Sequence, residues 1–362
     1  MIAKVNQSFR RDLVAKIDAL LKIMTQHDAS DLHISAGGPP VLRINGQLQR
    51  TKSQDLSSRE VEMLLLEILE EEHLAIFKER KDVNFSYELE GVARYRANVF
   101  SERKGYGAAF RIIPPEVKTL EELGLPESIG DLARTQSGLV MITGPTGSGK
   151  STTLAAIVDL INKEKNYHII TLEDPIEFIQ SKGKCLIHQR QLGHHVKSVP
   201  SGLRAALRED PDVIVVGDMS DPETIHLSLS AAESNLLVLG TLHTSSATDT
   251  IDRLIDVFPI YQQAQIRAMV SGSLRSVISQ RLLRRSDGQG RVAAVEVMVM
   301  NPAIQNLINE EKTYQIFYVI QASLDEGMQT MEAQINGIVK QGLVSREEAG
   351  LHLHENELDK PE

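Results

Sequence analysis

Apolar residues in the first third of the chain follow two different periods. Over residues 9–26 they recur at helical spacing, which predicts an amphipathic helix. Asn45 and Gly46 separate two short β-prone runs and therefore predict a hairpin turn. Ser57 and Glu60 have the spacing of a capping box, so a second helix is expected to begin there.

Alternation of apolar and polar residues follows, between positions 83 and 113. In VARYRANVF, Arg94, Arg96 and Asn98 fall on one face of the expected strand, and the apolar residues between them fall on the other. GYGAAFRII reads as a further strand that ends before Pro114. Together with the two helices, these strands predict a small α+β domain over residues 1–113.

The pattern changes after residues 114–137, a Pro- and Gly-containing stretch that we interpret as an interdomain linker. From residue 138 to residue 362, short apolar strands alternate with helices, which predicts a mainly parallel sheet covered by helices on both faces. Helices are expected to dominate after Ala247, interrupted by the strand-like VAAVEVMVM. The last residues read as a disordered acidic tail.

Composition narrows the class of protein. The 362 residues are 41% hydrophobic and 24% charged, as expected for a soluble protein with two cores. No stretch approaches the roughly 18 apolar residues of a membrane-spanning helix, and Cys185 is the single cysteine, which indicates a reducing, cytoplasmic location. The formal charge of −10 argues against nucleic acid as the main partner.

A phosphate-binding loop is the most specific motif of the sequence. GPTGSGKS matches the full Walker A pattern and lies between an apolar strand and a helix. Backbone N–H groups of this loop would surround phosphates, Lys150 would reach the terminal phosphates of ATP, and Ser151 would ligate Mg²⁺. The expected nucleotide-binding residues are Gly144, Pro145, Thr146, Gly147, Ser148, Gly149, Lys150, Ser151 and Thr152.

Acidic residues follow the next two expected strands. Glu173 and Glu177 lie in LEDPIEF, and Asp218 ends the apolar run VIVVGD in a Walker B arrangement. Ligands of open α/β sheets bind beyond the carboxyl ends of the strands. One of these carboxylates would therefore orient the attacking water, and Asp218 would join Ser151 at the metal. The alternative for Glu173 and Glu177 is a solvated acidic turn.

Basic side chains supply further candidates. Arg204 and Arg208 lie one helical turn apart and would meet phosphates or a neighbouring subunit, unless they form surface ion pairs. His243 follows another apolar strand and would sense the γ-phosphate, with a structural histidine as the alternative. Cys185 and three nearby histidines lie beyond LEDPIEF, in a stretch expected to form a hairpin and loop. These residue types bind Zn²⁺, but their spacing fits no closed zinc motif.

These motifs resemble those of the type IV pilus retraction ATPases, within the type II/IV secretion ATPase superfamily. The resemblance covers nearly the whole chain and rests on DASDLHIS, GPTGSGKST, ITLEDPIEF, REDPDVIVVGD, GTLHTSSA, IDRLIDVFP, ISQRLL and RVAAVEVM. It implies an α/β protein with an N-terminal α+β PAS-like domain. A RecA-like P-loop ATPase domain with a C-terminal helical region would follow.

The resemblance also implies an activity and its partners. A motor of this family is a homohexameric ring that binds ATP with Mg²⁺ and powers pilus retraction, and thereby twitching motility. It acts at the inner membrane on a platform protein of the pilus. Arginines of the N-terminal domain complete the ATP site in this family; Arg96 and Arg111 match them by position, with ordinary surface charge as the alternative.

Departures from the family pattern leave two other functions open. Asp218 stands where the family has glutamate, Ser220 where it has arginine, and Gln305 and Asn309 where the retraction motors carry arginines. One alternative is a hydrolysis-weakened paralogue that joins a ring powered by a related motor ATPase. The other is an ATPase of pilus assembly or type II secretion, whose usual long N-terminal extension and tetracysteine insertion do not occur in this sequence.

Overall fold

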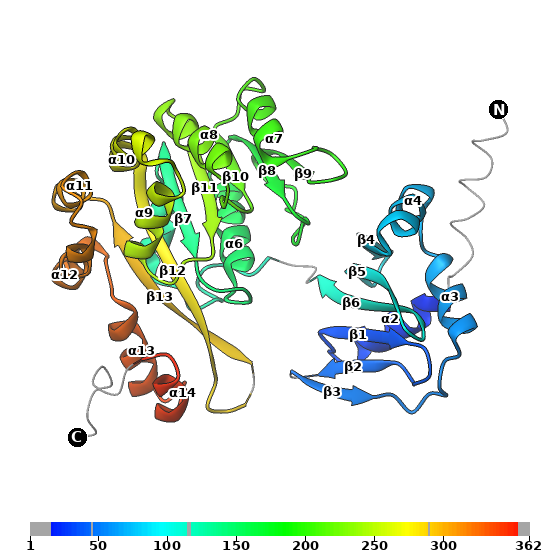
Figure 1. Ribbon diagram of the computed structural model, residues 1–362. Helices are drawn as coiled ribbons and strands as arrows, with labels where there is room; N and C mark the ends of the chain where they lie inside the picture. The colour runs from blue at the N-terminus through cyan, green and yellow to red at the C-terminus, as the bar shows by residue number, and fades with distance from the viewer. Residues whose placement is uncertain (1–15, 45, 114–116, 289, 354–362) are drawn as a thin grey trace. The chain divides into compact units, whose positions relative to one another are not determined.

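The chain folds as two compact units, Met1–Pro115 and Glu116–Glu362. The computed structural model describes residues 16–44, 46–113, 117–288 and 290–353 (Figure 1). Each unit has its own hydrophobic core, because the apolar positions of each half face inward within that half.

The first unit is a six-stranded antiparallel sheet in the order β3-β2-β1-β6-β5-β4. Its strands are β1 (Asp31–Ser35), β2 (Val41–Ile44), β3 (Gln47–Arg50), β4 (Asp82–Leu89), β5 (Ala93–Glu102) and β6 (Gly105–Ile113). Its helices are α2 (Lys16–Gln26), α3 (Ser58–Leu66) and α4 (Glu71–Arg80). Apolar side chains of all three helices share one core with the sheet, so the helices cover the same face of it.

Local signals of the sequence are confirmed in this unit. The Ser57 hydroxyl accepts the Glu60 N–H, and the Glu60 carboxylate accepts the Ser57 N–H at 2.7 Å, which completes the capping box of α3. The hairpin pairs Ile44 with Gln47, although Asn45 of its turn lies outside the described residues. The predicted helix at residues 9–26 is described from Lys16 onward as α2.

The second unit contains a seven-stranded sheet in the order β13-β12-β7-β11-β10-β8-β9. Its strands are β7 (Gly138–Thr143), β8 (His168–Glu173), β9 (Leu186–Gln191), β10 (Val213–Val216), β11 (Leu237–Leu242), β12 (Leu274–Arg284) and β13 (Arg291–Val299). All neighbouring strands pair in parallel except β12 and β13, which are antiparallel. The predicted mainly parallel sheet is therefore confirmed.

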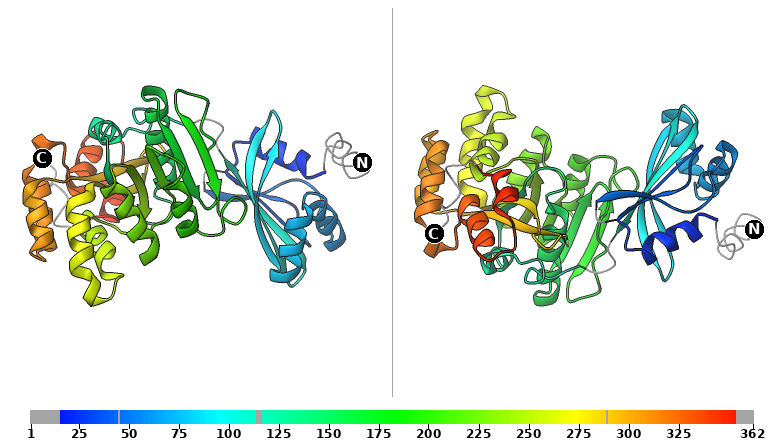
Figure 2. Two further views of the ribbon diagram at one scale, coloured as in Figure 1. Left: turned by 90° about the horizontal axis from the view of Figure 1, so that it is seen from above. Right: turned by 90° about the horizontal axis from the view of Figure 1, so that it is seen from below.

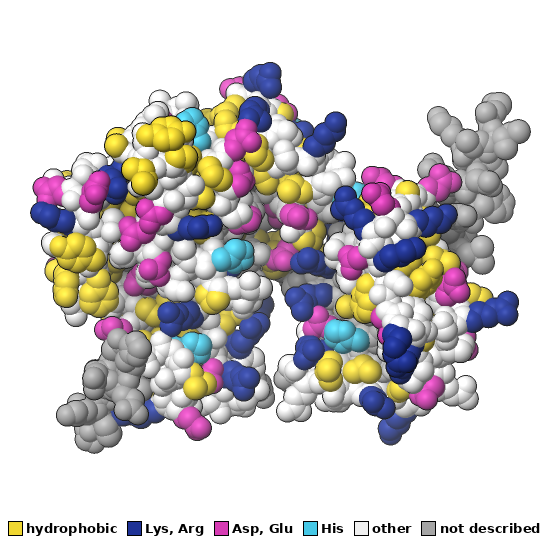
Figure 3. Space-filling view, in the orientation of Figure 1, with side chains coloured by type: hydrophobic (Ala, Val, Ile, Leu, Met, Phe, Trp, Pro, Cys, Tyr) yellow, Lys and Arg dark blue, Asp and Glu magenta, His cyan; other side chains and the backbone are white. Residues whose placement is uncertain are grey.

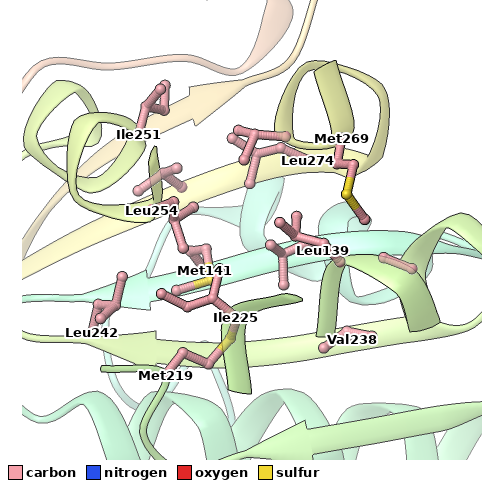
Figure 4. Close-up of a cluster of buried hydrophobic side chains, with 14 of the residues drawn as sticks. Leu139, Met141, Met219, Ile225, Val238, Leu242, Ile251, Leu254, Met269 and Leu274 are labelled. Carbon is pink, nitrogen blue, oxygen red and sulfur yellow. The ribbon is translucent and has the colours of Figure 1, made fainter. Parts of the chain in front are cut away.

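Helices cover both faces of this sheet. They are α5 (Glu127–Ala133), α6 (Lys150–Glu164), α7 (Val199–Ala206), α8 (Pro222–Glu233), α9 (Ala247–Asp256), α10 (Ile260–Ser273), α11 (Pro302–Asn309), α12 (Ile316–Ala322), α13 (Met331–Lys340) and α14 (Arg346–Gly350), with 3₁₀ turns η1 (Thr313–Gln315) and η2 (Leu324–Glu326). Strand β7 shows why both faces are covered. Leu139 and Met141 point into the core under α7 to α12, shown in Figure 4, whereas Val140 and Ile142 point into the core under α5 and α6.

The C-terminal helices lie at one end of this unit. Helices α13 and α14 pack on β12 and β13 through a separate small core, and α11 and α12 lie far from the edge strand β9 (Figures 1 and 2). On the face of each unit that Figure 3 displays, basic side chains are interspersed with acidic ones. In the described part of the chain, no helix combines the length and the apolar character needed to cross a bilayer.

Three predictions about organisation need correction. The stretch interpreted as a linker over residues 114–137 contains α5, whose Ile129 and Leu132 are buried in the core of the second unit. The region beyond LEDPIEF was predicted as a hairpin and loop, but β9 pairs in parallel with β8. The helical region predicted after Ala247 also contains β12, which pairs with β7 inside the sheet.

Candidate nucleotide site

The glycine-rich loop connects the end of β7 to the start of α6. Gly144, Gly147 and Gly149 have φ values of 143°, 80° and 90°, which only glycine adopts without strain. A Cβ atom on Gly144 would also lie 2.2 Å from the backbone oxygen of Gln280. No side chain caps α6, so its first N–H groups remain available to an anion bound in the loop.

Lys150 lies inside this loop and is only 9% exposed. Its ammonium donates to the carbonyl oxygens of Gly144 at 2.8 Å and Pro145 at 3.1 Å, and it lies 3.3 Å from Nδ1 of His243. Burial lowers the pKa of Lys150, and the negative charges of Asp218 and Glu177 oppose that shift. Two neutral carbonyl oxygens therefore hold the ammonium in place, and a charged phosphate oxygen could take their position.

The predicted chemical groups meet at one edge of the sheet. In the parallel registers, Leu172 is opposite Val216, Val216 is opposite Gly240, and Leu242 is opposite Thr143. Glu173, Asp218 and His243 follow or end these strands, and the glycine-rich loop follows Thr143. The sheet thus brings them together beyond its carboxyl edge, where open α/β sheets bind ligands.

Glu173 is a partly buried carboxylate at this edge. Its Oε1 accepts hydrogen bonds from Thr171 Oγ1 at 2.6 Å and from Gln189 Nε2 at 3.2 Å. Burial raises the pKa of Glu173 and the charge of Glu177 raises it further, although the two hydrogen bonds act in the opposite direction. A carboxylate whose pKa moves toward neutrality is suited to accept a proton.

Asp218 is exposed at the end of β10. Its Oδ2 accepts a hydrogen bond from Ser220 Oγ at 2.8 Å. Ser151 begins α6 and is also exposed. A hydroxyl and a carboxylate are the oxygen donors that Mg²⁺ prefers, and Mg²⁺ usually takes only one or two protein ligands besides phosphates and water. The residues present therefore fit that ion.

The arginines near α7 have other partners. The guanidinium of Arg204 forms an ion pair with Glu223 of α8. Arg208 follows the end of α7, and its Nε donates to the carbonyl oxygen of Arg204 at 3.1 Å. Neither contact involves the glycine-rich loop, so a role of these arginines at the nucleotide stays a prediction.

Arg96 and Arg111 belong to the first unit. They stand opposite each other on β5 and β6, on the face away from the helices. Arg111 is further held by Asp31 of β1, whose Oδ1 accepts from Arg111 Nε at 2.8 Å. The two arginines thus form a local pair of positive charges, and their role at a nucleotide also stays a prediction.

The residues considered for zinc do not converge. Cys185 Sγ lies 3.2 Å from the carbonyl oxygen of Lys165, His188 Nδ1 lies 2.9 Å from His168 Nε2, and His195 Nδ1 accepts from the Gln191 N–H. Among the residues that the structure describes, no group of three or more His, Cys, Asp or Glu side chains could hold a metal ion.

Sequence reasoning missed the residues that support the loop from behind. Gln280 of β12 and Thr153 of α6 are buried and contact each other next to the loop. Gln280 lies in ISQRLL, one of the segments on which the family resemblance rests, but a polar residue inside an apolar run does not show what that residue touches.

Comparisons with known proteins show what the chain is similar to. The family model "Type II/IV secretion system protein" matches residues 7–351. The chain is 49% identical over 333 residues to the "Type IV pilus retractation ATPase PilT" of Pseudomonas aeruginosa, covering 92% of this chain and 96% of that protein. It is 47% identical over 310 residues to a "Twitching motility protein" of Neisseria gonorrhoeae, covering 86% of this chain and 83% of that protein.

A solved structure is similar over most of the chain. The pilus retraction motor PilT with bound ADP has a TM-score of 0.85 and 43% sequence identity, covering 94% of this chain and 96% of that one.

Proposed function

Since the chain belongs to the type II/IV secretion system protein family, we propose that it is an ATP-hydrolysing ring motor that powers retraction of type IV pili. The observation that carries the proposal is the buried Lys150 inside a glycine-rich loop, beside carboxylates at the ends of adjacent parallel strands. The similarity to retraction ATPases over nearly the full chain supports the same function.

The proposal assigns a role to each group at the sheet edge. Lys150 exchanges the two loop carbonyls for the phosphates of ATP, and the free N–H groups at the start of α6 bind the same phosphates. Mg²⁺, when bound by Ser151 and Asp218, supplies positive charge to the β and γ phosphates. Glu173, assisted by Glu177, orients the water and accepts its proton, and His243 beside Lys150 contacts the γ-phosphate.

The two units would act together in a ring. In this proposal the first unit is PAS-like, the second is RecA-like, and six copies assemble into a homohexamer. Arg96 and Arg111 complete an ATP site at a subunit boundary, with Arg111 held by Asp31. Arg204 and Arg208 face phosphates or a neighbouring copy. The ring acts at the inner membrane on the pilus platform protein.

A second function is favoured by one site feature. Asp218 and its partner Ser220 replace the glutamate and arginine of the family pattern. A chain with a short carboxylate at this position would bind nucleotide well and hydrolyse it slowly. It would then serve as a nucleotide-binding subunit of a ring driven by a related motor.

Phosphate release from purified protein with Mg²⁺ and ATP tests the proposal. Lys150→Ala is expected to lower turnover by about 100-fold or more, because no other cation replaces the lost charge at the phosphates. Lys163→Ala is the matched control, since Lys163 lies near the other end of the same helix, where its exposed side chain pairs with the buried Asp159. Turnover that survives in Lys150→Ala would refute the site, and tight ADP binding without turnover in the wild type would favour the second function.

A further inference from the structure

Strand β12 forms the back wall of the glycine-rich loop. It pairs in parallel with β7, and Ser279 stands opposite Thr143, the last residue before the loop. Gln280, the next residue of β12, therefore lies directly beside Gly144. Its side chain is 3% exposed, so its amide is removed from water and must be hydrogen-bonded within the protein.

Both ends of the Gln280 amide are bound. Nε2 donates to the backbone carbonyl oxygen of Ser148 at 2.7 Å, and Oε1 accepts from Thr153 Oγ1 at 2.7 Å. The Ser148 carbonyl oxygen can only accept, so the nitrogen end of the amide must face it, and the Thr153 hydroxyl donates to the oxygen end that remains. Thr153 lies on the first turn of α6, and thus Gln280 connects the loop to the helix that follows it.

The bond to Ser148 determines how the next peptide is oriented. The peptide unit is planar and trans, so its carbonyl oxygen and its N–H point in opposite directions. Since the Ser148 oxygen is held toward β12, the N–H of Gly149 points away from β12, to the side of the loop where phosphates bind. Arg291 of β13 likewise donates to the Gly147 carbonyl oxygen at 3.3 Å and so holds the Gly147–Ser148 peptide.

The last glycine of the loop is fitted to this contact. Gly149 has a φ of 90°, and a Cβ atom there would lie 2.7 Å from Gln280 Nε2. A side chain at position 149 would therefore displace the amide that orients the loop. This close approach gives Gly149 a packing reason in addition to its backbone conformation.

We propose that Gln280 is a positioning residue for nucleotide binding: it holds the Ser148–Gly149 peptide so that the Gly149 N–H faces the phosphates, and Thr153 supports it by donating to the oxygen end of its amide. The inference rests on the proposed function in one respect only, namely that the loop binds a nucleotide. The N–H binds phosphate before and during hydrolysis alike, so loss of the contact weakens binding and leaves kcat nearly unchanged.

The test measures ADP binding by calorimetry, together with KM and kcat. Gln280→Glu keeps the size of the side chain and the acceptor for Thr153, but it places an oxygen against the Ser148 oxygen. We expect ADP to bind at least about tenfold more weakly, with kcat within about threefold of the wild type. Gln329→Glu is the matched control, because Gln329 also donates to a backbone carbonyl, that of Val295 at 2.8 Å, away from the loop.

Thr153 provides an independent route to the same result. Thr153→Val removes the hydroxyl and keeps the shape, so it should weaken ADP binding, whereas Thr153→Ser should bind ADP like the wild type. Because the two residues act through one contact, Gln280→Glu and Thr153→Val together should lose less than the product of their separate effects.

Circular dichroism and thermal unfolding establish which variants are folded. Folded Gln280→Glu with wild-type ADP affinity overturns the inference, as does a loss confined to kcat. If Gln280→Glu does not fold, Thr153→Val decides, and wild-type affinity in that variant overturns it. Failure of the proposed function is distinct from these outcomes, since it appears as a wild-type protein that binds no ADP.

Discussion

Replacement of Asp218 by glutamate is expected to raise the rate of ATP hydrolysis. Aspartate keeps the carboxylate but holds its oxygens roughly 1 Å short of the position that glutamate reaches, and a misplacement of 1 Å can cost about 100-fold in rate. The added methylene can therefore raise kcat by about 100-fold at most. The substitution also removes a contact, because Asp218 Oδ2 is bound to the Ser220 hydroxyl at 2.8 Å.

The lost contact reduces the expected gain. A hydrogen bond of this kind contributes about 0.5–1.5 kcal/mol, which corresponds to roughly a two- to tenfold change in an equilibrium. The net gain is therefore about 10- to 50-fold at most, and we expect Asp218→Glu to raise kcat at least several-fold. Nucleotide affinity should change little, because the glycine-rich loop and Lys150 hold ATP whether or not the water is well placed.

Steady-state phosphate release and ADP calorimetry on matched preparations measure both quantities. The double variant Asp218→Glu/Ser220→Ala separates the effect of the longer side chain from that of the lost hydrogen bond. It is compared with Ser220→Ala, and in neither of these two proteins does a Ser220 hydroxyl bind the carboxylate. Ser220→Ala alone is the control for the loss of the hydroxyl. If Asp218→Glu is as slow as the wild type or slower in both backgrounds, the strand end is adapted to aspartate and the reach calculation is wrong.

Two further predictions concern stability and assembly. Glu296 accepts the Ala247 N–H at 2.7 Å, and burial raises the pKa of its carboxyl group. The stability that Glu296 contributes through this shift is complete below the unfolded pKa of about 4.3 and is lost as pH rises through the folded pKa. Glu296→Gln should therefore increase the free energy of unfolding at pH 8 but not at pH 4, as urea titrations at both pH values would show, and a less stable variant at pH 8 would contradict this. The proposed homohexamer should appear by light scattering with a nonhydrolysable ATP analogue, whereas a monomer with and without the analogue would exclude a ring.

Features of the fold that depend on short sequence patterns could be predicted. The capping box at Ser57, the hairpin after Ile44 and the loop around Lys150 each depend on residues only a few positions apart. The carboxyl ends of the parallel strands were also predictable, because alternating strands and helices place those ends on one edge. Glu173, Asp218 and His243 were found for that reason.

Strand β12 could not be predicted in the same way. Its residues Val277 and Ile278 point into the two opposite cores of the second unit, so the segment shows no alternation of apolar and polar residues. An apolar run of this kind fits a buried helix as well as a buried strand. Helix α5 was missed for a related reason, since its seven residues are too few to show a clear period.

The missed strand explains why the candidate reacting residues were easier to predict than the residues that hold the glycine-rich loop. The residues proposed to react lie within motifs and at strand ends, where a local pattern identifies them. Residues that hold the loop are brought together only by the sheet: Gln280 lies 127 positions from Thr153 and 132 from Ser148. No short pattern contains both members of such a contact, so only the folded sheet shows it. The affinity of this protein for nucleotide should therefore depend on β12 as well as on the Walker motifs.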